Sequence, residues 1–347
     1  MDVSLLNLVP LRAGQEFKSA VDDMVTLAQR TERYGYSRYW IAEHHNMKRL
    51  ASSATQLLIQ RTLANTETIR VGSGGVMLPN HSPYLVAEQY GTLEALYPNR
   101  VDLGLGRAPG TDQQTARALR RTDNLYSDFA SELKELRGYF DDTNGVHAYP
   151  AAGLDIPFYI LGSSTDSAYL AAHLGLPYVF AAHFAPAMME SAIKIYRHNF
   201  EPSNYLIEPY VILCANAILA DTDEEAKRLA TTQTQSFLGI VTGSQEGLLP
   251  PKDSDDEVWD HYVEAKIAPH FGPIAFKTED VVYREKAVVN QMTSVTIVGS
   301  PETAKQQLAE LHSRAPFDEL MAQSLIYDQD AQAYSYKLLA DVMKDFK

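Results

Sequence analysis

The feature that most constrains this chain is the stretch from Ile69 to Gly110, which predicts a strand, a helix and a second strand in succession. The helical segment begins after Pro83, carries apolar residues at helical spacing, and stops before Pro98. Two strands joined by a crossover helix run parallel, and the connection is right-handed. We therefore expect a parallel sheet that is covered by helices.

Both strands of this unit contain glycines. In the first strand, from Val71 to Leu78, glycines and a serine interrupt a β-favouring run, which indicates a close approach of the backbone to another group. The second strand, from Val101 to Gly106, is followed directly by Arg107. A cation therefore emerges from the C-terminal end of a strand beside bare backbone.

The same alternation of strand and helix continues along the chain. Strands are predicted at about residues 3–9, 39–42, 71–78, 101–106, 157–161, 177–181, 209–219 and 319–327. Eight parallel βα units favour an α/β fold of the (β/α)8 TIM barrel type over an open sheet. We expect residues 1–347 to form a single domain.

About eighty residues separate the seventh and eighth units. We interpret residues 239–318 as an insertion over one end of the barrel, with a local strand and helix near its end. Its first part, about 239–291, contains the run LLPPKDSDDE, and this composition predicts a mobile lid that cannot form a compact core.

Composition excludes several classes of protein. The formal net charge of −14 argues against a nucleic-acid or anionic-membrane partner, because both would repel an acidic surface. The single cysteine, Cys214, excludes an internal disulfide and a cysteine-based zinc site. No signal peptide and no apolar run of about 20 residues is found, so a cytoplasmic protein is expected.

In a βα barrel the chemistry lies at the C-terminal ends of the strands, so those ends can be compared directly. Here they carry polar side chains: Glu43, His44 and His45, then Asn80, Arg107, Ser163 with Ser164, and His183. Each has a structural alternative, since a histidine can be a buried hydrogen-bonding group, an arginine can pair with an acid, and a serine can cap a helix. Their convergence on one rim favours a functional site.

The turn from Gly162 to Ser167 is typical of an anion site. Backbone N–H groups and hydroxyls meet the N-terminus of a helix, whose dipole favours negative charge. No lysine follows as in a Walker loop, and the dinucleotide pattern G-x-G-x-x-G is absent. The phosphate of a mononucleotide, assisted by Arg107, is the ligand that this turn suits.

The adjacent pair His44 and His45 also raises the possibility of a metal hydrolase. Strand residues at i and i+2 point the same way, whereas adjacent ones diverge, so we expect only one of the two to face the barrel axis. No third histidine at a matching spacing and no carboxylate cluster is evident. A metal site is therefore the less favoured interpretation of this pair.

Several segments together resemble the bacterial luciferase-like monooxygenase family over nearly the whole chain. They are WIAEHHN, VGSGGVMLPNHSPYLVAEQ, NRVDLGLGRAPG, ILGSSTDSAYLAAHLGLPYVFAAHFAP and VGSPETAKQQL. The chain is most similar to members of the family that have no established substrate. The resemblance implies a βα barrel, a dimer, and a flavin-dependent oxidoreductase that uses reduced FMN and O2. Such an enzyme oxygenates a small organic substrate through a flavin C4a-hydroperoxide, and a separate flavin reductase is expected because no nicotinamide fingerprint is seen.

The resemblance also implies roles for individual residues. His44 would act in flavin chemistry as a proton relay, since the pKa of histidine is ordinarily about 6.5. Gly74 and Gly75 would form a cis peptide under the flavin ring. Arg107, Ser164 and Ser167 would bind the phosphate, together with Ser163, where luciferase has a glutamate. Gly106 stands where luciferase has a reactive cysteine, and leaves more room near the ring.

Three alternatives remain open from the sequence. They are a deazaflavin (F420)-dependent dehydrogenase on the same fold, a flavin-binding protein without turnover, and a metal hydrolase. The identity of the substrate is not encoded in these motifs, because variable loops line the pocket.

Overall fold

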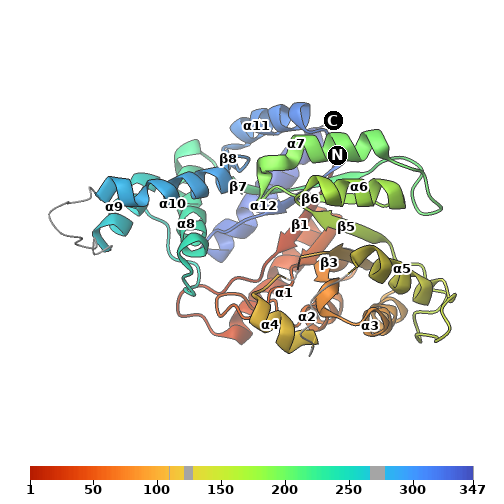
Figure 1. Ribbon diagram of the computed structural model, residues 1–347. Helices are drawn as coiled ribbons and strands as arrows, with labels where there is room; N and C mark the ends of the chain where they lie inside the picture. The colour runs from red at the N-terminus through yellow and green to blue at the C-terminus, as the bar shows by residue number, and fades with distance from the viewer. Residues whose placement is uncertain (109, 121–127, 266–277, 347) are drawn as a thin grey trace.

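The computed structural model describes residues 1–108, 110–120, 128–265 and 278–346, and its centre is a closed barrel of parallel strands (Figure 1). The ring runs β1–β2–β3–β4–β5–β6–β7–β9 and closes between β9 and β1. Its strands are β1 (Asp2–Asn7), β2 (Arg38–Ile41), β3 (Arg70–Met77), β4 (Val101–Gly106), β5 (Phe158–Gly162), β6 (Tyr178–Ala181), β7 (Val211–Leu219) and β9 (Glu319–Gln323). The predicted TIM barrel is confirmed.

A helix follows each of these strands and packs on the outside of the ring. The helices are α2 (Thr55–Leu63), α3 (Pro83–Leu96), α5 (Phe129–Phe140), α6 (Thr165–Leu174), α7 (Met189–Asn199), α8 (Asp223–Thr242) and α12 (Gln329–Asp345), with α1 (Phe17–Tyr34) after β1. Short 3-10 helices, η1 (Leu78–Asn80) and η2 (Pro186–Met188), follow β3 and precede α7. Helix α1 shows why the pattern works, because Ala20, Met24 and Ala28 bury one face and Gly35 ends the helix in the left-handed conformation, at φ 89°.

Side chains fill the barrel and close its N-terminal end. Trp40, from β2, is fully buried inside the ring. Below it, Arg38 lies 3.2 Å from a carboxylate oxygen of Asp102 and 3.0 Å from one of Glu319. Burial alone would lower the pKa of Arg38, but the two carboxylates outweigh it and raise the pKa. This ion-pair cluster occupies the N-terminal end, so the C-terminal end carries the cavity described below.

The insertion before β9 consists of α9 (Asp255–Ala265), α10 (Thr278–Thr293), β8 (Ile297–Gly299) and α11 (Pro301–Arg314). Strand β8 pairs with β7 outside the closed ring, and α9 and α10 project from the barrel at the left of Figure 1. The prediction that residues 239–291 cannot form a compact core is wrong. Their apolar residues join the ends of α8 and β9 in one buried cluster: Phe237, Leu238, Leu248, Val258, Trp259, Val289 and Leu325. Residues 266–277 of the expected lid lie outside the described residues, and movement of the segment stays a prediction.

Other boundaries differ locally from the sequence prediction. The sequence predicts a polar loop after Arg107 and then a helix from about Leu125 to Phe140, but the polar stretch contains a helix, α4 (Gln113–Arg120). The predicted start of the next helix, at Leu125, lies outside the described residues, and α5 begins after Asp128, whose carboxylate accepts a hydrogen bond from the Ser131 N–H. Strand β1 ends two residues early because Val9 takes a positive φ of 50°.

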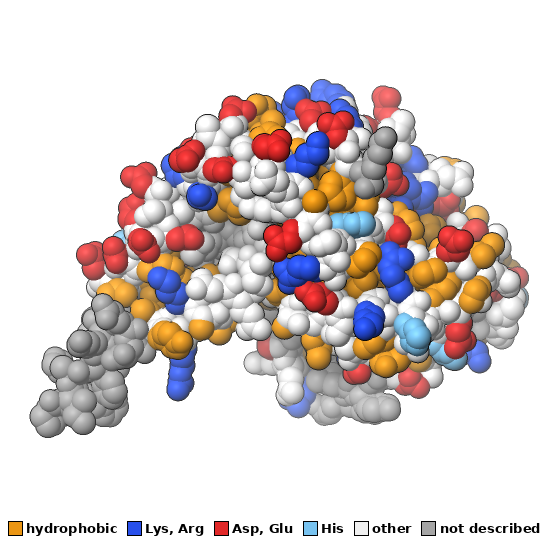
Figure 2. Space-filling view, turned by 90° about the horizontal axis from the view of Figure 1, so that it is seen from above, with side chains coloured by type: hydrophobic (Ala, Val, Ile, Leu, Met, Phe, Trp, Pro, Cys, Tyr) orange, Lys and Arg blue, Asp and Glu red, His pale blue; other side chains and the backbone are white. Residues whose placement is uncertain are grey.

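The face of the molecule shown in Figure 2 carries charges of both signs. On the face shown in Figure 2, basic and acidic side chains are interspersed with apolar ones rather than gathered into one basic area. Within the described part of the chain, no helix has both the length and the apolar character needed to cross a bilayer.

Candidate functional site

A cavity of about 560 Å³ opens at the C-terminal ends of the strands. This size lies within the range of about 300 to 1,000 Å³ that is common for small-molecule sites. Loops after β1 to β6 and helix α8 supply most of its walls. Its lining includes Leu6, Leu8, His44, Met47, Arg49, Leu50, Gly74, Met77, Gly106, Arg107, Ser163, Ser164, Ser167, His183, Phe184, Cys214, Phe237, Ile240, Glu246, Leu248, Met292 and Met321.

Most of the residues predicted from the sequence meet in this cavity. The cavity is lined by His44, Gly74, Arg107, Ser163, Ser164 and Ser167, although these residues lie within or after four different strands. Gly75 does not line it and packs against β4 instead. A Cβ on Gly75 would lie 2.8 Å from the carbonyl oxygen of Gly104, so only glycine allows the two strands to approach this closely.

The Gly74–Gly75 peptide bond is cis, as predicted. The pairing of β3 with β4 also shifts register between Ser73 and Val76, so the strand is bulged at the same place. These glycines therefore combine a cis peptide bond with a bulge of the strand. The bulge directs Gly74 toward the cavity.

Helix α6 presents an open N-terminus at one end of the cavity. Ser164 is its N-cap residue, yet the Ser164 side chain makes no capping hydrogen bond. The Ser167 hydroxyl donates to the Ser164 carbonyl oxygen at 2.7 Å. Gly162 makes room for this turn, since a Cβ there would lie 2.1 Å from the Ser167 oxygen. The first N–H groups of the helix are thus available to an anion.

Arg107 lies beside the same helix start. Its guanidinium is 3.9 Å from the carboxylate of Asp166, and the two side chains are 59% and 75% exposed. A pair this exposed is weak, so Arg107 can turn to another anion at little cost. Asp166 would repel such an anion, but its exposure lets the carboxylate point into solvent. We call Arg107, Ser163, Ser164 and Ser167 the anion end of the cavity.

His44 and His183 are neutral groups in the cavity wall. Burial is the main cause that lowers the pKa of His44 to about 4; the carboxylate of Glu43 opposes this shift, and the positive charge of Arg49 adds to it. Burial also lowers the pKa of His183 to about 3, with His44 adding to the shift. The Nδ1 atoms of both rings are buried without a hydrogen-bond partner. The expected pKa near 6.5 for His44 is therefore wrong for this cavity, since the ring stays neutral at pH 7.

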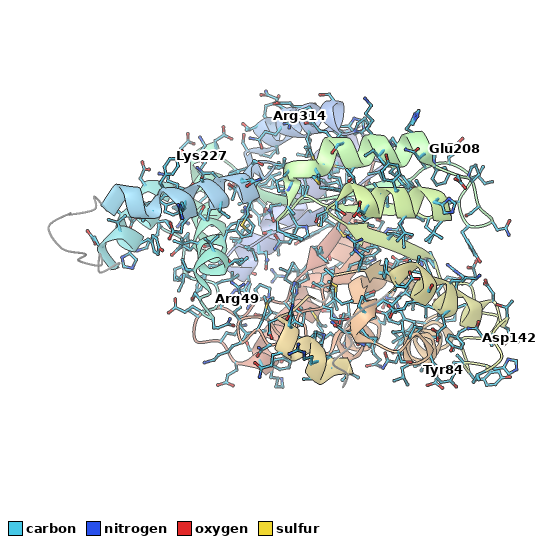
Figure 3. The ribbon with its side chains drawn as sticks, in the orientation of Figure 1. Arg49, Tyr84, Asp142, Glu208, Lys227 and Arg314 are labelled. Atoms are coloured by element: carbon cyan, nitrogen blue, oxygen red, sulfur yellow. The ribbon has the colours of Figure 1, made fainter. Side chains whose placement is uncertain are left out.

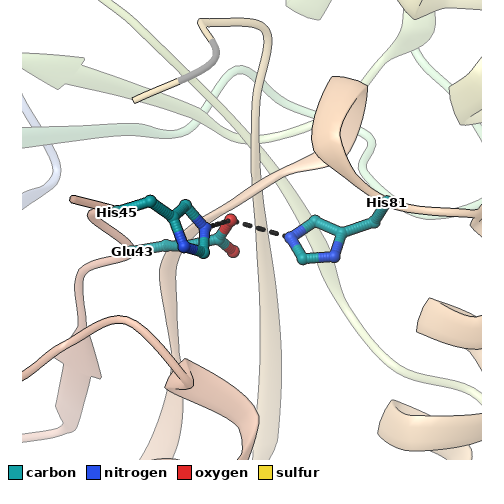
Figure 4. A group of neighbouring side chains, drawn as sticks. All are labelled: Glu43, His45 and His81. Atoms are coloured by element: carbon teal, nitrogen blue, oxygen red, sulfur yellow. Dashed lines mark hydrogen bonds and ion pairs between the residues drawn. The ribbon is translucent and has the colours of Figure 1, made fainter. Parts of the chain in front are cut away.

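A second cluster lies behind the cavity wall, around the carboxylate of Glu43 (Figure 4). One oxygen, Oε1, accepts hydrogen bonds from His45 Nε2 at 2.9 Å and from His81 Nε2 at 2.7 Å. The other oxygen accepts from the Met77 N–H at 3.3 Å. Burial alone would raise the pKa of Glu43, but the hydrogen bonds from both histidines lower the pKa to about 2.

This cluster corrects the expectation that no third histidine joins the pair after β2. His81 follows η1, and its ring reaches the same carboxylate as His45. The three ligand atoms lie within 4.8 Å of one another, so the donor set suits a divalent metal in kind. The hydrogen bonds account for the arrangement without an ion, because they tie the ends of β2 and β3 together. His44 stands between Glu43 and His45 in the chain and points the other way, into the cavity.

The space next to Gly106 is smaller than the sequence suggested. The thioether of Met77 fills it, because a Cβ on Gly106 would lie 3.1 Å from the Met77 sulfur. Sequence reasoning also missed Arg49 and the apolar residues Phe237 and Met292, which reach the cavity from the loop after β2, from α8 and from α10. The position of Arg49, eight residues after the end of β2, was the available signal.

The fold and the site now define the class of protein. Residues 1–316 match the family model described as luciferase-like monooxygenase, and the chain belongs to this family. An enzyme of the flavin-dependent oxidoreductase type is the function that this family suggests.

Individual relatives agree over the full length. The chain is 46% identical to the uncharacterized protein YvbT of Bacillus subtilis, with 99% of this chain and 97% of that protein covered. It is 42% identical to a luciferase-like monooxygenase of Escherichia coli, with the same two shares covered. Among solved structures, apo-MsnO8 superposes with a TM-score of 0.83 at 32% identity, covering 99% of this chain and 98% of that one.

Proposed function

We propose that this chain is a monooxygenase that uses reduced FMN and O2 to insert one oxygen atom into a small organic substrate. The observation that carries the proposal is the cavity itself. One end is an anion site built on the uncapped start of α6 and on Arg107, and the remaining wall is largely apolar and contains the neutral imidazole of His44. A cofactor with a phosphate at one end and an aromatic ring at the other fits a cavity with one anion-binding end and one apolar part.

The residues present fit FMN. Arg107, Ser163, Ser164 and Ser167 would hold its phosphate, and the bulge at Gly74 leaves backbone without a side chain beside the cavity. When bound in its reduced form, FMN supplies the electrons that activate O2. The chain itself shows no nicotinamide fingerprint, so a separate reductase would deliver the reduced cofactor.

The protein contributes a cavity that excludes water, orients the bound molecules and contains a group that can exchange protons. Leu6, Phe237 and Leu248 line it with apolar surface, which excludes water from the reacting groups. His44 is uncharged at pH 7, and a negative charge that develops on a bound ligand would raise the pKa of the ring from about 4 toward the range in which it accepts a proton. His45 and His81, which are hydrogen-bonded to Glu43, fix the segment that carries His44 and so orient its ring.

Relatives support oxygenation more directly than the fold does. The chain is 28% identical to the N-acetyl-S-alkylcysteine monooxygenase of Bacillus subtilis over 98% of both proteins. It is 21% identical to the oxygenase component of a flavin-dependent trigonelline monooxygenase of Acinetobacter baylyi, and an oxygenase component implies a partner that supplies reduced flavin. We propose the same division of labour here, and a homodimer as the assembled form.

The cofactor is the point that an experiment must decide. An FMN-bound monooxygenase structure and an F420-dependent alcohol dehydrogenase structure share this fold at 16% and 13% identity, so the fold does not choose between them. The test titrates the purified chain with FMN and with F420, and then supplies photoreduced FMN and ¹⁸O-labelled O2 to a panel of sulfur-containing and aromatic compounds.

The expected result is binding of FMN in preference to F420 and one ¹⁸O atom in a product detected by mass spectrometry. Preference for F420, with hydride transfer that does not need O2, would replace the proposal by the dehydrogenase. Tight FMN binding with no labelled product and no O2 consumption across the panel would favour a flavin-binding protein without turnover.

A further inference from the structure

Arg49 is a cation in the cavity wall that the anion end does not use. It lies in the loop after β2, and its Nη1 atom is 3.8 Å from the position that a Cβ on Gly239 would take. The side chain therefore touches the C-terminal part of α8, beside which Figure 3 labels it. Its backbone is fixed as well, because the Arg49 carbonyl oxygen accepts from the Leu11 N–H at 2.9 Å.

The guanidinium of Arg49 has no partner among the residues that the structure describes. No ion pair or side-chain hydrogen bond involves it, and its Nε atom is buried without an acceptor. Burial lowers the pKa of Arg49, and no carboxylate offsets this effect. Arg38, by contrast, is more deeply buried but lies against the carboxylates of Asp102 and Glu319. A buried donor without an acceptor costs free energy, and proteins usually avoid it unless a ligand supplies the acceptor.

Glu246 is the acid that shares the cavity with Arg49. Its side chain is exposed, and it forms no ion pair with the guanidinium in the structure. The Glu246 carboxylate therefore lies at the rim, and Arg49 places a positive charge deeper in the wall on this side. A ligand with an anionic group would therefore meet an unpaired cation after it has passed the rim.

Arg49 and the anion end lie on opposite sides of the barrel. The anion end follows β4 and β5, and Arg49 bridges from the loop after β2 to the helix after β7. In the ring order, the gap between β2 and β7 is spanned by β1 and β9, which face β4 and β5 across the axis. A cofactor phosphate held at one end leaves Arg49 for a different molecule.

We propose that Arg49 binds the carboxylate of the organic substrate, and that the substrate is a monocarboxylic acid with an apolar body. This inference rests on the proposed function, because it assigns the anion end to the cofactor. A guanidinium matches the planar carboxylate with two parallel hydrogen bonds. Leu8, Met47, Leu50 and Phe237 line the same cavity with apolar surface, so the rest of the molecule is hydrophobic. His44 and Arg49 interact electrostatically, so a substrate carboxylate bound to Arg49 would lie near the proposed proton acceptor.

The test compares carboxylates with their uncharged amides. The probes are three matched pairs: decanoate and decanamide, 4-phenylbutanoate and 4-phenylbutanamide, and N-acetyl-S-benzylcysteine and its amide. Their affinities for the full chain, with and without saturating FMN, are measured by calorimetry. In the wild type, at least one carboxylate should bind ten-fold or more tightly than its amide. Arg49→Gln should abolish this preference and Arg49→Lys should keep part of it, while both leave the FMN affinity unchanged.

Lys48→Gln is the matched control. It removes one positive charge from the neighbouring position, but Lys48 is exposed and does not line the cavity, so the preference should persist. The proposal is overturned if no pair prefers the carboxylate, if the preference survives Arg49→Gln, or if Arg49→Gln weakens FMN and the carboxylates alike. A carboxylate preference that depends on Arg49 in a chain that binds no FMN would uphold the anion site and refute the proposed function.

Discussion

Replacing Arg107 with alanine separates the role of this side chain in cofactor binding from any role in the fold. Its ion pair with Asp166 spans 3.9 Å between exposed groups, and such pairs add little to the free energy of unfolding. The variant should therefore remain folded. A charge-assisted hydrogen bond to phosphate contributes about 1.5 to 3 kcal/mol, so its loss should weaken FMN binding about 10- to 150-fold.

The assay is titration of flavin fluorescence with FMN and, in parallel, with riboflavin, which lacks the phosphate. The wild type should bind FMN more tightly than riboflavin, and Arg107→Ala should weaken FMN while leaving riboflavin unchanged. Asp166→Asn should strengthen FMN binding, because it removes a like charge from the same helix start. Arg61→Ala, which breaks another exposed pair far from the cavity, serves as the control. Equal affinity of the wild type for the two flavins would refute the phosphate assignment.

Three further predictions concern residues that shape the cavity. The pKa of His44 is lowered to about 4 in the folded chain, so between about pH 6.5 and 4 the unfolded chain binds a proton that the folded chain does not. The melting temperature of the wild type should therefore fall over that interval, and His44→Gln should make this fall smaller. The pKa of Glu43 is lowered to about 2, so its contribution is present above about 4.5 and is lost below; Glu43→Gln should reduce the free energy of unfolding at pH 7 by about 1.5 to 3 kcal/mol in urea titrations. Gly75→Val should impair folding and FMN binding, because its Cβ meets the Gly104 backbone at 2.8 Å, whereas Gly145→Ala, with nothing within 4 Å, should be tolerated in the same assays.

The barrel could be predicted from the sequence because its signal is local and repeated. Each strand and each helix has its own hydrophobic period, and eight such units in succession leave few alternatives. The rim residues followed from this, since the ends of parallel strands share one face. Helix α4 could not be predicted in the same way, because Gln113 to Arg120 is short and mostly polar.

The parts of the site that depend on packing were not visible in the sequence. His81 reaches Glu43 only through the turn of η1, although 38 positions separate the two residues. The neutral state of His44 depends on its burial, which the neighbouring sequence does not reveal. Val258 and Trp259 are flanked by acidic residues in the sequence, so their burial was not predicted. In the structure both belong to a buried apolar cluster. Arg49 belongs to no sequence motif, and only the structure reveals that it has no acidic partner among the described residues.

The sulfur atoms in the cavity wall bear on how long such an enzyme stays active. Four of the nine methionines, Met47, Met77, Met292 and Met321, line the cavity. Thioethers are readily converted to sulfoxides, which turns an apolar wall polar. If O2 is activated in this cavity, turnover without substrate should oxidise these four side chains and inactivate the protein. Met188, which is 46% exposed and does not line the cavity, should be modified first by peroxide added from outside. Peptide mass spectrometry after each treatment distinguishes oxidation during turnover from oxidation by added peroxide.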